Sequence, residues 1–282
     1  MDGMRTEFRK AICSRWFVVP LCVMLVIAVI SAIGGFVSDS KSSSYYQFLS
    51  TKWLDPSTSS CFKYSIVCDF TQPSTDLFFL LLPLFCTIPF SWTLLNELNS
   101  GFISNVAIRV RASVYLRNKY FVAFVVGGCI ALIPIVVNSA LCACLLPGRV
   151  PDVTSSIYFA VFDSNLFSWL FYNCPVAYLA AYAVLNFIFC GVWSAFVMSL
   201  SFLIRRPFLL LAVPYGTLIV FKAVFSSLPL EYINFELSPF VFLRGCALSS
   251  QQSGWFILSF VAVLLLFITA TILFIGKRGF YE

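Results

Sequence analysis

The residues best suited to chemistry or recognition lie in one stretch, Asn96–Lys119, between two strongly apolar segments. Glu97 supplies a carboxylate, and Gly101 allows a tight turn of the backbone. Arg109 and Arg111 then add two guanidinium groups. A carboxylate, a turn and a group of arginines can bind an acidic or basic surface of another chain, or lipid phosphates. Because arginines also mark the cytoplasmic side of membrane proteins, topology explains them equally well.

Conventional catalytic and metal chemistry has few residues to work with. The sequence contains no histidine, which removes the commonest metal ligand and the usual base near neutral pH. Intramembrane metalloproteases and serine hydrolases with a histidine base are therefore excluded in their usual forms. Lys222 with Ser226 or Ser227 is a conceivable Ser–Lys pair, but nothing else supports it. We expect no catalytic residues and no metal site in this chain.

Eleven cysteines are present, and most fall in apolar stretches, where cysteine packs as a small hydrophobic residue. Cys61 and Cys68 lie instead in a Ser- and Thr-rich loop. They are candidates for a disulfide if that loop faces an oxidising compartment. Cys174 and Cys246 form a second, weaker candidate pair.

The elements that position these residues are transmembrane helices. Sixty per cent of the residues are hydrophobic, 11% are charged and 32 are Phe, more apolar surface than a soluble fold of this length can cover. Stretches of about 18–25 apolar residues predict spanning helices. The chain thus reads as one all-α transmembrane domain, residues 1–282. Its six expected spans are Trp16–Phe36, Leu77–Leu95, Phe121–Leu146, Val176–Leu203, Pro207–Leu228 and Trp255–Ile275.

Orientation follows from the basic residues. With both termini in the cytoplasm, twelve of the 18 Lys and Arg residues fall on the cytoplasmic side, as the positive-inside rule requires. These twelve are Arg5, Arg9, Lys10, Arg15, Arg109, Arg111, Arg117, Lys119, Arg205, Arg206, Lys277 and Arg278. The net charge of +6 therefore reflects topology, and we expect no nucleic-acid partner. Residues 37–76 form the largest outer loop.

Two cytoplasmic segments have helical amphipathic patterns. In Asn96–Lys119 the apolar positions are Phe102, Ile103, Val106, Val110, Val114 and Tyr115. The N-terminal segment Met4–Arg15 is basic, with Phe8, Ala11 and Ile12 on one side. Both are expected to lie at the membrane surface, either as simple anchors or, for 96–119, as a docking helix. Two outer patches, Asn165–Tyr172 and Leu237–Leu243, are too short to span and are expected to be re-entrant or interfacial.

The sequence Glu97-Leu98-Asn99-Ser100-Gly101, followed by Tyr115-x-x-x-Lys119, resembles the E-x-x-x-G and Y-x-x-x-K signature of the ABC transporter type-2 permease family. In that family the motif opens a cytoplasmic coupling helix after the second of six spans. The resemblance implies ATPase-coupling roles for Glu97, Ser100, Gly101, Arg109, Arg111, Tyr115 and Lys119. It also implies a second permease subunit, the same or homologous, and a separate ABC ATPase that binds the ATP and Mg²⁺. The chain itself has no G-x-x-x-x-G-K-[ST] motif.

The family would make this chain a multi-pass plasma-membrane permease subunit of an exporter, with no cofactor of its own. The Phe-rich spans, poor in fixed charge, suit a hydrophobic or amphipathic substrate such as a peptide, a lipid-linked glycan or a drug-like molecule. Two other classes stay open. A secondary transporter or channel usually needs an acidic or histidine residue within its spans, and these spans have neither. A non-transporting membrane sensor or scaffold is the other.

Overall fold

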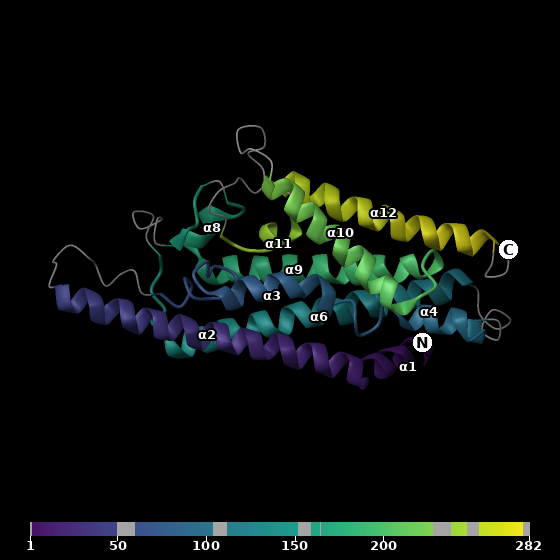
Figure 1. Ribbon diagram of the computed structural model, residues 1–282, viewed down its shortest axis with the longest axis horizontal. Helices are drawn as coiled ribbons and strands as arrows, with labels where there is room; N and C mark the ends of the chain where they lie inside the picture. The colour runs from purple at the N-terminus through teal and green to yellow at the C-terminus, as the bar shows by residue number, and fades with distance from the viewer. Residues whose placement is uncertain are drawn as a thin grey trace.

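The structure is a computed structural model that describes residues 2–49, 60–103, 112–151, 159–163, 165–227, 238–246 and 254–278. Every secondary-structure element in these ranges is a helix. They are α1 (Asp2–Ile12), α2 (Arg15–Leu49), α3 (Pro73–Phe85), α4 (Thr93–Asn99), α6 (Ala112–Leu145), α8 (Ser168–Asn173), α9 (Pro175–Ser199), a 3₁₀ turn (Leu200–Phe202), α10 (Pro207–Ser227), α11 (Pro239–Phe242) and α12 (Gly254–Arg278). The long helices run side by side along one axis, and α1 lies at the same end of the bundle as the end of α12 (Figure 1).

Five helices are long and apolar enough to cross a membrane, so the chain is a multi-pass integral membrane protein. Their candidate spans are Arg15–Lys41, Ser113–Leu145, Pro175–Phe202, Pro207–Val224 and Gly254–Phe274. They correspond to the first, third, fourth, fifth and sixth spans expected from the sequence. The agreement has a simple cause, because a run of about 20 apolar residues that must satisfy its own backbone groups in hydrocarbon can only be helical.

The expected second span, Leu77–Leu95, is not one continuous helix. Helix α3 ends at Phe85, residues 86–92 form turns, and α4 begins at Thr93. Pro89 explains the interruption, because proline lacks the backbone donor and disfavours helix in the residue before it. With 13 residues, α3 alone measures only about 20 Å, short of the roughly 30 Å of hydrocarbon.

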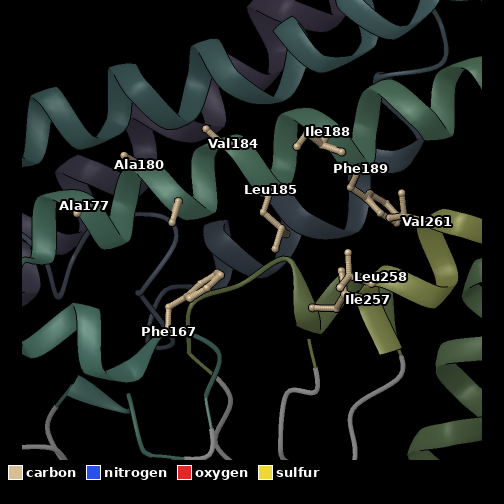
Figure 2. A pocket seen from close by; sticks show the side chains of 11 residues that line it. Phe167, Ala177, Ala180, Val184, Leu185, Ile188, Phe189, Ile257, Leu258 and Val261 are labelled. Atoms are coloured by element: carbon tan, nitrogen blue, oxygen red, sulfur yellow. The ribbon is translucent and has the colours of Figure 1, made fainter. Parts of the chain in front are cut away.

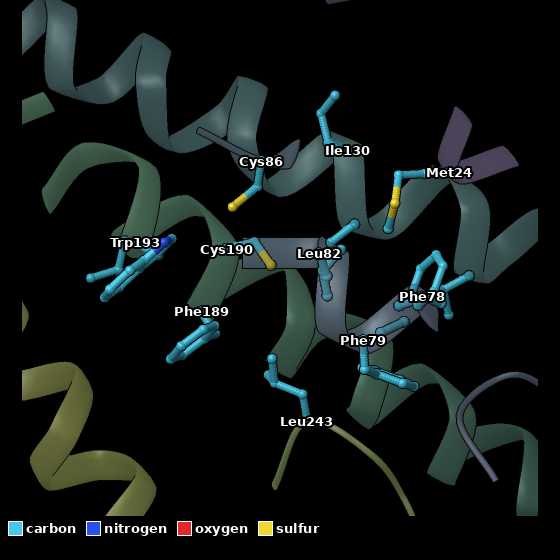
Figure 3. Close-up of a cluster of buried hydrophobic side chains, with 14 of the residues drawn as sticks. Met24, Phe78, Phe79, Leu82, Cys86, Ile130, Phe189, Cys190, Trp193 and Leu243 are labelled. Atoms are coloured by element: carbon cyan, nitrogen blue, oxygen red, sulfur yellow. The ribbon is translucent and has the colours of Figure 1, made fainter. Parts of the chain in front are cut away.

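Hydrogen bonds to α9 stabilise this break. The indole Nε1 of Trp193 donates to the carbonyl of Pro83 at 3.1 Å, and the hydroxyl of Ser91 donates to the carbonyl of Ser194, also at 3.1 Å. Irregular backbone at membrane depth is tolerated where it is buried in protein and its polar groups are paired. Figure 3 shows Trp193 and Cys190 of α9 facing Leu82 and Cys86, with Ile130 of α6 nearby.

Helices α6 and α9 form the centre of the bundle. Their most apolar windows are 56% and 67% buried, whereas those of α10 and α12 are each 17% buried. Glycines bring the two backbones together: a Cβ on Gly127 would lie 2.6 Å from the Cβ of Ser194, and one on Gly191 would lie 2.6 Å from the carbonyl oxygen of Phe124. Such close approach lets dispersion forces hold membrane helices together where water provides no hydrophobic drive.

At the end of the bundle opposite the termini, residues 238–246 fold into the protein. Phe240, Phe242 and Leu243 are almost completely buried. The amide of Asn186 donates to the carbonyl of Leu243 at 3.0 Å, and the hydroxyl of Tyr178 donates to the carbonyl of Gly245. Of the two expected outer patches, the described part of Leu237–Leu243 is therefore inserted between helices. The Asn165–Tyr172 patch has both buried and exposed side chains and includes α8 except for its last residue.

Candidate functional site

One buried lysine, Lys119, is central to the ion pairs at the end of the bundle where the termini lie. The ammonium of Lys119 lies 2.5 Å from Oε2 of Glu97 and 3.8 Å from Oε2 of Glu7. The hydroxyl of Tyr115 donates to the same Glu97 oxygen. We call Glu7, Glu97, Tyr115 and Lys119 the Lys119 cluster. It joins α1, α4 and the first turns of α6, three elements that are separate in the sequence.

The surroundings of Lys119 explain how a charge is kept at this position. The lysine side chain is 1% exposed, while Glu97 and Glu7 are 19% and 15% exposed. The ammonium also lies 5.3 Å from the ring centroid of Tyr115 and 5.6 Å from that of Phe90. A buried ammonium needs such opposite charges and aromatic faces, because losing its water shell is costly.

The sequence motif and the geometry coincide at three of the seven expected coupling residues. Glu97, Tyr115 and Lys119 meet in one cluster, and the spacing of four between Tyr115 and Lys119 places both side chains on one face of α6. These two residues belong to the long helix α6, because α6 already begins at Ala112. The sequence predicted one amphipathic helix that extends to Lys119. The C-terminal part of that prediction is corrected, because the residues from Ala112 onward belong to α6.

Ser100 and Gly101 lie beside the cluster and shape the chain there. Gly101 has a φ of 70°, the left-handed conformation that glycine adopts without strain, which agrees with the expected tight turn after α4. The Ser100 hydroxyl donates to the carbonyl of Glu97 at 3.3 Å. The Asn99 amide donates to the carbonyl of Arg205 at 3.3 Å, so the end of α4 also contacts the connection between α9 and α10. Arg109 and Arg111 lie outside the described residues.

Two members of this environment were not expected from the sequence. Glu7 belongs to α1, which was expected only to lie at the membrane surface. Phe90 belongs to the break in the second apolar segment. The one local signal for Glu7 was its spacing of three from Lys10, whose ammonium lies 3.3 Å away. Apolar contacts seat α1 as well, since the ring of Phe8 packs edge-on against Phe121 at 6.2 Å and Ala11 is buried.

The expected outer disulfide is not formed, and all eleven cysteines are free. The ends of this segment are tied to different elements: Cys61 N donates to the carbonyl of Pro147 at 3.0 Å, and Gly245 N donates to that of Val67 at 2.8 Å. Cys68 thereby lies towards the 238–246 segment. Burial raises the pKa of both the Cys61 and the Cys68 thiol, which disfavours the reactive thiolate. Cys174 is exposed and Cys246 buried, also without a disulfide.

Polar side chains within the spans mostly connect helices. Asn138 of α6 donates to the carbonyl of Ala28 on α2 at 2.7 Å and accepts from Ile66 N at 2.7 Å. Ser91 and Ser194 join the break to α9. Such bonds hold membrane helices together. No group of three His, Cys, Asp or Glu side chains within the described ranges could hold a metal ion.

The Lys119 cluster is thus a buried ionic joint between the N-terminal helix, the end of α4 and the start of α6. No protein-family model, no curated protein and no solved structure matches this chain.

Proposed function

We propose that this chain is the membrane-spanning permease subunit of an ABC-type exporter in the plasma membrane. It would pair with a second permease subunit and move a hydrophobic or amphipathic substrate. The energy would come from ATP hydrolysed, with Mg²⁺, on a separate ATPase subunit. Both termini would lie in the cytoplasm, on the side where the ATPase binds.

The convergence of Glu97, Tyr115 and Lys119 is the observation that carries this proposal. Three residues selected by a spacing motif lie up to 22 positions apart in the sequence, yet they form one bonded group. A chance match to the motif would place Tyr115 and Lys119 on one face of α6, but it would give no reason for Glu97 of α4 to meet them. The cluster also lies at the end of the bundle that holds α1 and the end of α12 (Figure 1), as a cytoplasmic coupling region requires.

The broken path through α3 and α4 would serve as the second of six crossings. The two helices follow each other along the long axis of the bundle (Figure 1). With the five continuous candidates, this crossing would give an even number of passes, so both termini would lie on one side. In this proposal a push from the ATPase on the segment after Glu97 would move α4, and the turn residues 86–92 would absorb the movement.

Recovery of the partner tests the proposal directly. A pull-down of tagged protein from its native host in mild detergent is expected to recover a Walker-type ATPase in stoichiometric amount. If no ATPase is recovered under conditions that preserve other transporter complexes, the proposal is refuted.

A matched pair of variants tests the role of Glu97 within the recovered complex. Glu97→Gln keeps an acceptor for Tyr115 and leaves Glu7 near Lys119, so the complex is expected to assemble but to lose substrate-stimulated ATPase activity. Glu7→Gln removes the same charge from the same cluster, but on α1, and is expected to keep most of the stimulation. Equal loss in both variants would mean that Glu97 has only a structural role.

The broken crossing gives a secondary transporter some support as a second candidate. Discontinuous helices often form the substrate site of such transporters, and Thr87 and Ser91 in this break are buried. Purified protein in liposomes without any ATPase would then accumulate substrate in response to an ion gradient. Uptake that an ionophore abolishes would favour this class over the ATP-driven one.

A further inference from the structure

Two apolar cavities flank α9 near its first residue, at the end of the bundle opposite the termini. One, of about 590 Å³, lies between α9 and α12, and its lining includes Ala181 and Leu185 of α9, Ile257 and Leu258 of α12, and Phe167. Figure 2 shows Leu185, Ile257, Leu258 and Phe167 around it. All of its lining side chains are apolar. The second, of about 410 Å³, lies between α9 and α6.

Ala180 lines both cavities and forms part of the ridge between them. The ridge consists of Val176, Ala180 and Val184, which follow one another at intervals of four residues on α9. Val176 and Val184 are 66% and 54% exposed. On the α6 side the second cavity is bordered by exposed Val136 and by Ser139. Both cavities therefore open towards the hydrocarbon that surrounds a membrane protein.

The length of the first cavity matches one leaflet. Its lining on α9 runs from Ala177 to Phe189, which at 1.5 Å per residue is about 18 Å. Half of a hydrocarbon core of about 30 Å is about 15 Å. The lining starts within two residues of Pro175, where α9 begins. A chain that enters from the bilayer surface would thus fill the cavity and end near the middle of the membrane.

Positive charge lies where a lipid headgroup would be. Gly148 is one of the residues that line the second cavity, and its neighbour Arg149 is exposed. Helix α9 starts between the two cavities with no side chain capping it, and the positive end of its dipole favours a phosphate. The apolar grooves and the cationic end together have the polarity of a phospholipid.

We propose that one two-chained phospholipid straddles the first turns of α9, with one acyl chain in each cavity and its phosphate near Arg149. A helix from a second copy, about 10 Å across, would need one open groove, whereas the Ala180 ridge divides this surface into two narrow ones. The proposal concerns only lipid binding and stands whether or not the chain transports a substrate.

Photo-crosslinking tests this site. The full chain is placed in nanodiscs that contain phosphatidylcholine with a diazirine in its acyl chains, and labelled peptides are identified by mass spectrometry. We expect labelling to concentrate on α9 residues 176–189 and on both neighbours, α6 residues 135–143 and α12 residues 257–261. Labelling spread evenly over α10 and the other lipid-facing helices would overturn the proposal.

Three variants identify the cavities. Ala180→Trp is expected to reduce labelling in both cavities by about tenfold, the loss expected when about two methylene groups no longer fit. Ala181→Phe should reduce it only at α12. Val220→Trp, at a 62% exposed site on α10 that lines neither cavity, should leave both unchanged. Unchanged labelling in Ala180→Trp that elutes as a monodisperse peak would refute the site.

Competition separates a two-chained ligand from a single chain. Unlabelled phosphatidylcholine should displace the probe from both cavities together. Lysophosphatidylcholine, which has the same headgroup and one chain, should compete at least about tenfold less well. Equal competition by the two lipids would contradict the two-chained ligand and show that each cavity takes an independent acyl chain.

Discussion

Replacement of Lys119 by Met gives the most direct test of the Lys119 cluster. Methionine keeps the length and apolar character of the side chain but removes its charge. Glu97 would then lose the ammonium that lies 2.5 Å from its carboxylate, and Glu7 would lose the one at 3.8 Å and keep only the exposed Lys10 at 3.3 Å. We expect a large loss of stability, because the remaining carboxylates keep their desolvation cost and lose their partner.

The magnitude follows from the burial of the pair. Breaking a buried ion pair costs about 3–5 kcal/mol. The two carboxylates are 19% and 15% exposed, so solvent relieves part of the strain and we expect the lower end, about 3 kcal/mol. At about 2–4 °C per kcal/mol for a chain of this size, the apparent unfolding temperature should fall by about 6–12 °C.

Intrinsic fluorescence in detergent can follow this unfolding. Trp16 and Trp92 pack edge-on with their ring centroids 4.4 Å apart, at the starts of α2 and α4, so separation of these elements should change the emission. Lys10→Met is the matched control. It removes a lysine that also pairs with Glu7, but this side chain is 63% exposed, and a surface pair contributes at most about 1 kcal/mol.

Two results would refute the reasoning. One is a Lys119→Met variant that unfolds within about 2 °C of Lys10→Met, equivalent to less than about 1 kcal/mol. The other is strict additivity with Glu97→Gln. If the two side chains stabilise each other, the double variant should lose less stability than the sum of the single variants, because Glu97→Gln removes the uncompensated carboxylate that Lys119→Met leaves.

Three further predictions concern other parts of the bundle. Gly191→Ala should destabilise the protein by about 1–3 kcal/mol in a thermal unfolding assay, because the new Cβ would lie 2.6 Å from Phe124 on α6; Gly216→Ala, with open space around it, is the control. Burial raises the pKa of Asp69, so its contribution to stability is present below the ordinary pKa of about 3.9 and lost as pH rises through the raised value. Asp69→Asn should therefore unfold at a higher temperature than the unsubstituted protein near pH 8 and at the same temperature near pH 3. If the two proteins unfold at the same temperature at both pH values, the raised pKa of the buried carboxyl group is contradicted. A membrane-impermeant maleimide added to intact cells should label exposed Cys174 and reach exposed Cys13 only after permeabilisation; the opposite order would reverse the topology.

Hydropathy could predict the five continuous helices because their cause is local. Each run of apolar residues must bond its own backbone in hydrocarbon, whatever surrounds it. The broken crossing depends on more than local sequence. Its proline is visible in the sequence, but Pro134 and Pro214 are accommodated within α6 and α10. What stabilises the break is the bond that Trp193 donates to Pro83 and the bond that Ser91 donates to Ser194, both of which join residues about 100 positions apart in the sequence.

The residues of the candidate site were likewise only partly predictable from the sequence. A spacing motif could select Glu97, Tyr115 and Lys119, because they lie close together in the sequence, at the end of α4 and in the first turns of α6. Glu7 could not be found by spacing, because its place depends on how α1 packs against α6. The disulfide expected between Cys61 and Cys68 is not formed in the structure, for a related reason. Seven residues of sequence separation suggest proximity, but backbone bonds to Pro147 and from Gly245 hold the two thiols towards different elements.

The arrangement of rigid and interrupted elements bears on how a force at the Lys119 cluster would travel. Helices α6 and α9 approach too closely at Gly127 and Gly191 to slide past one another, and the Trp193 bond ties the end of α3 to α9. A displacement of α4 would therefore be taken up at residues 86–92, where Pro89 lacks a backbone donor and the helix is interrupted. Opening the far end requires a different step, because residues 238–246 are bonded to α9 itself. In the proposed mechanism the two ends would thus be coupled through α9, and substitutions that loosen its contact with α3 should weaken that coupling without disturbing the Lys119 cluster.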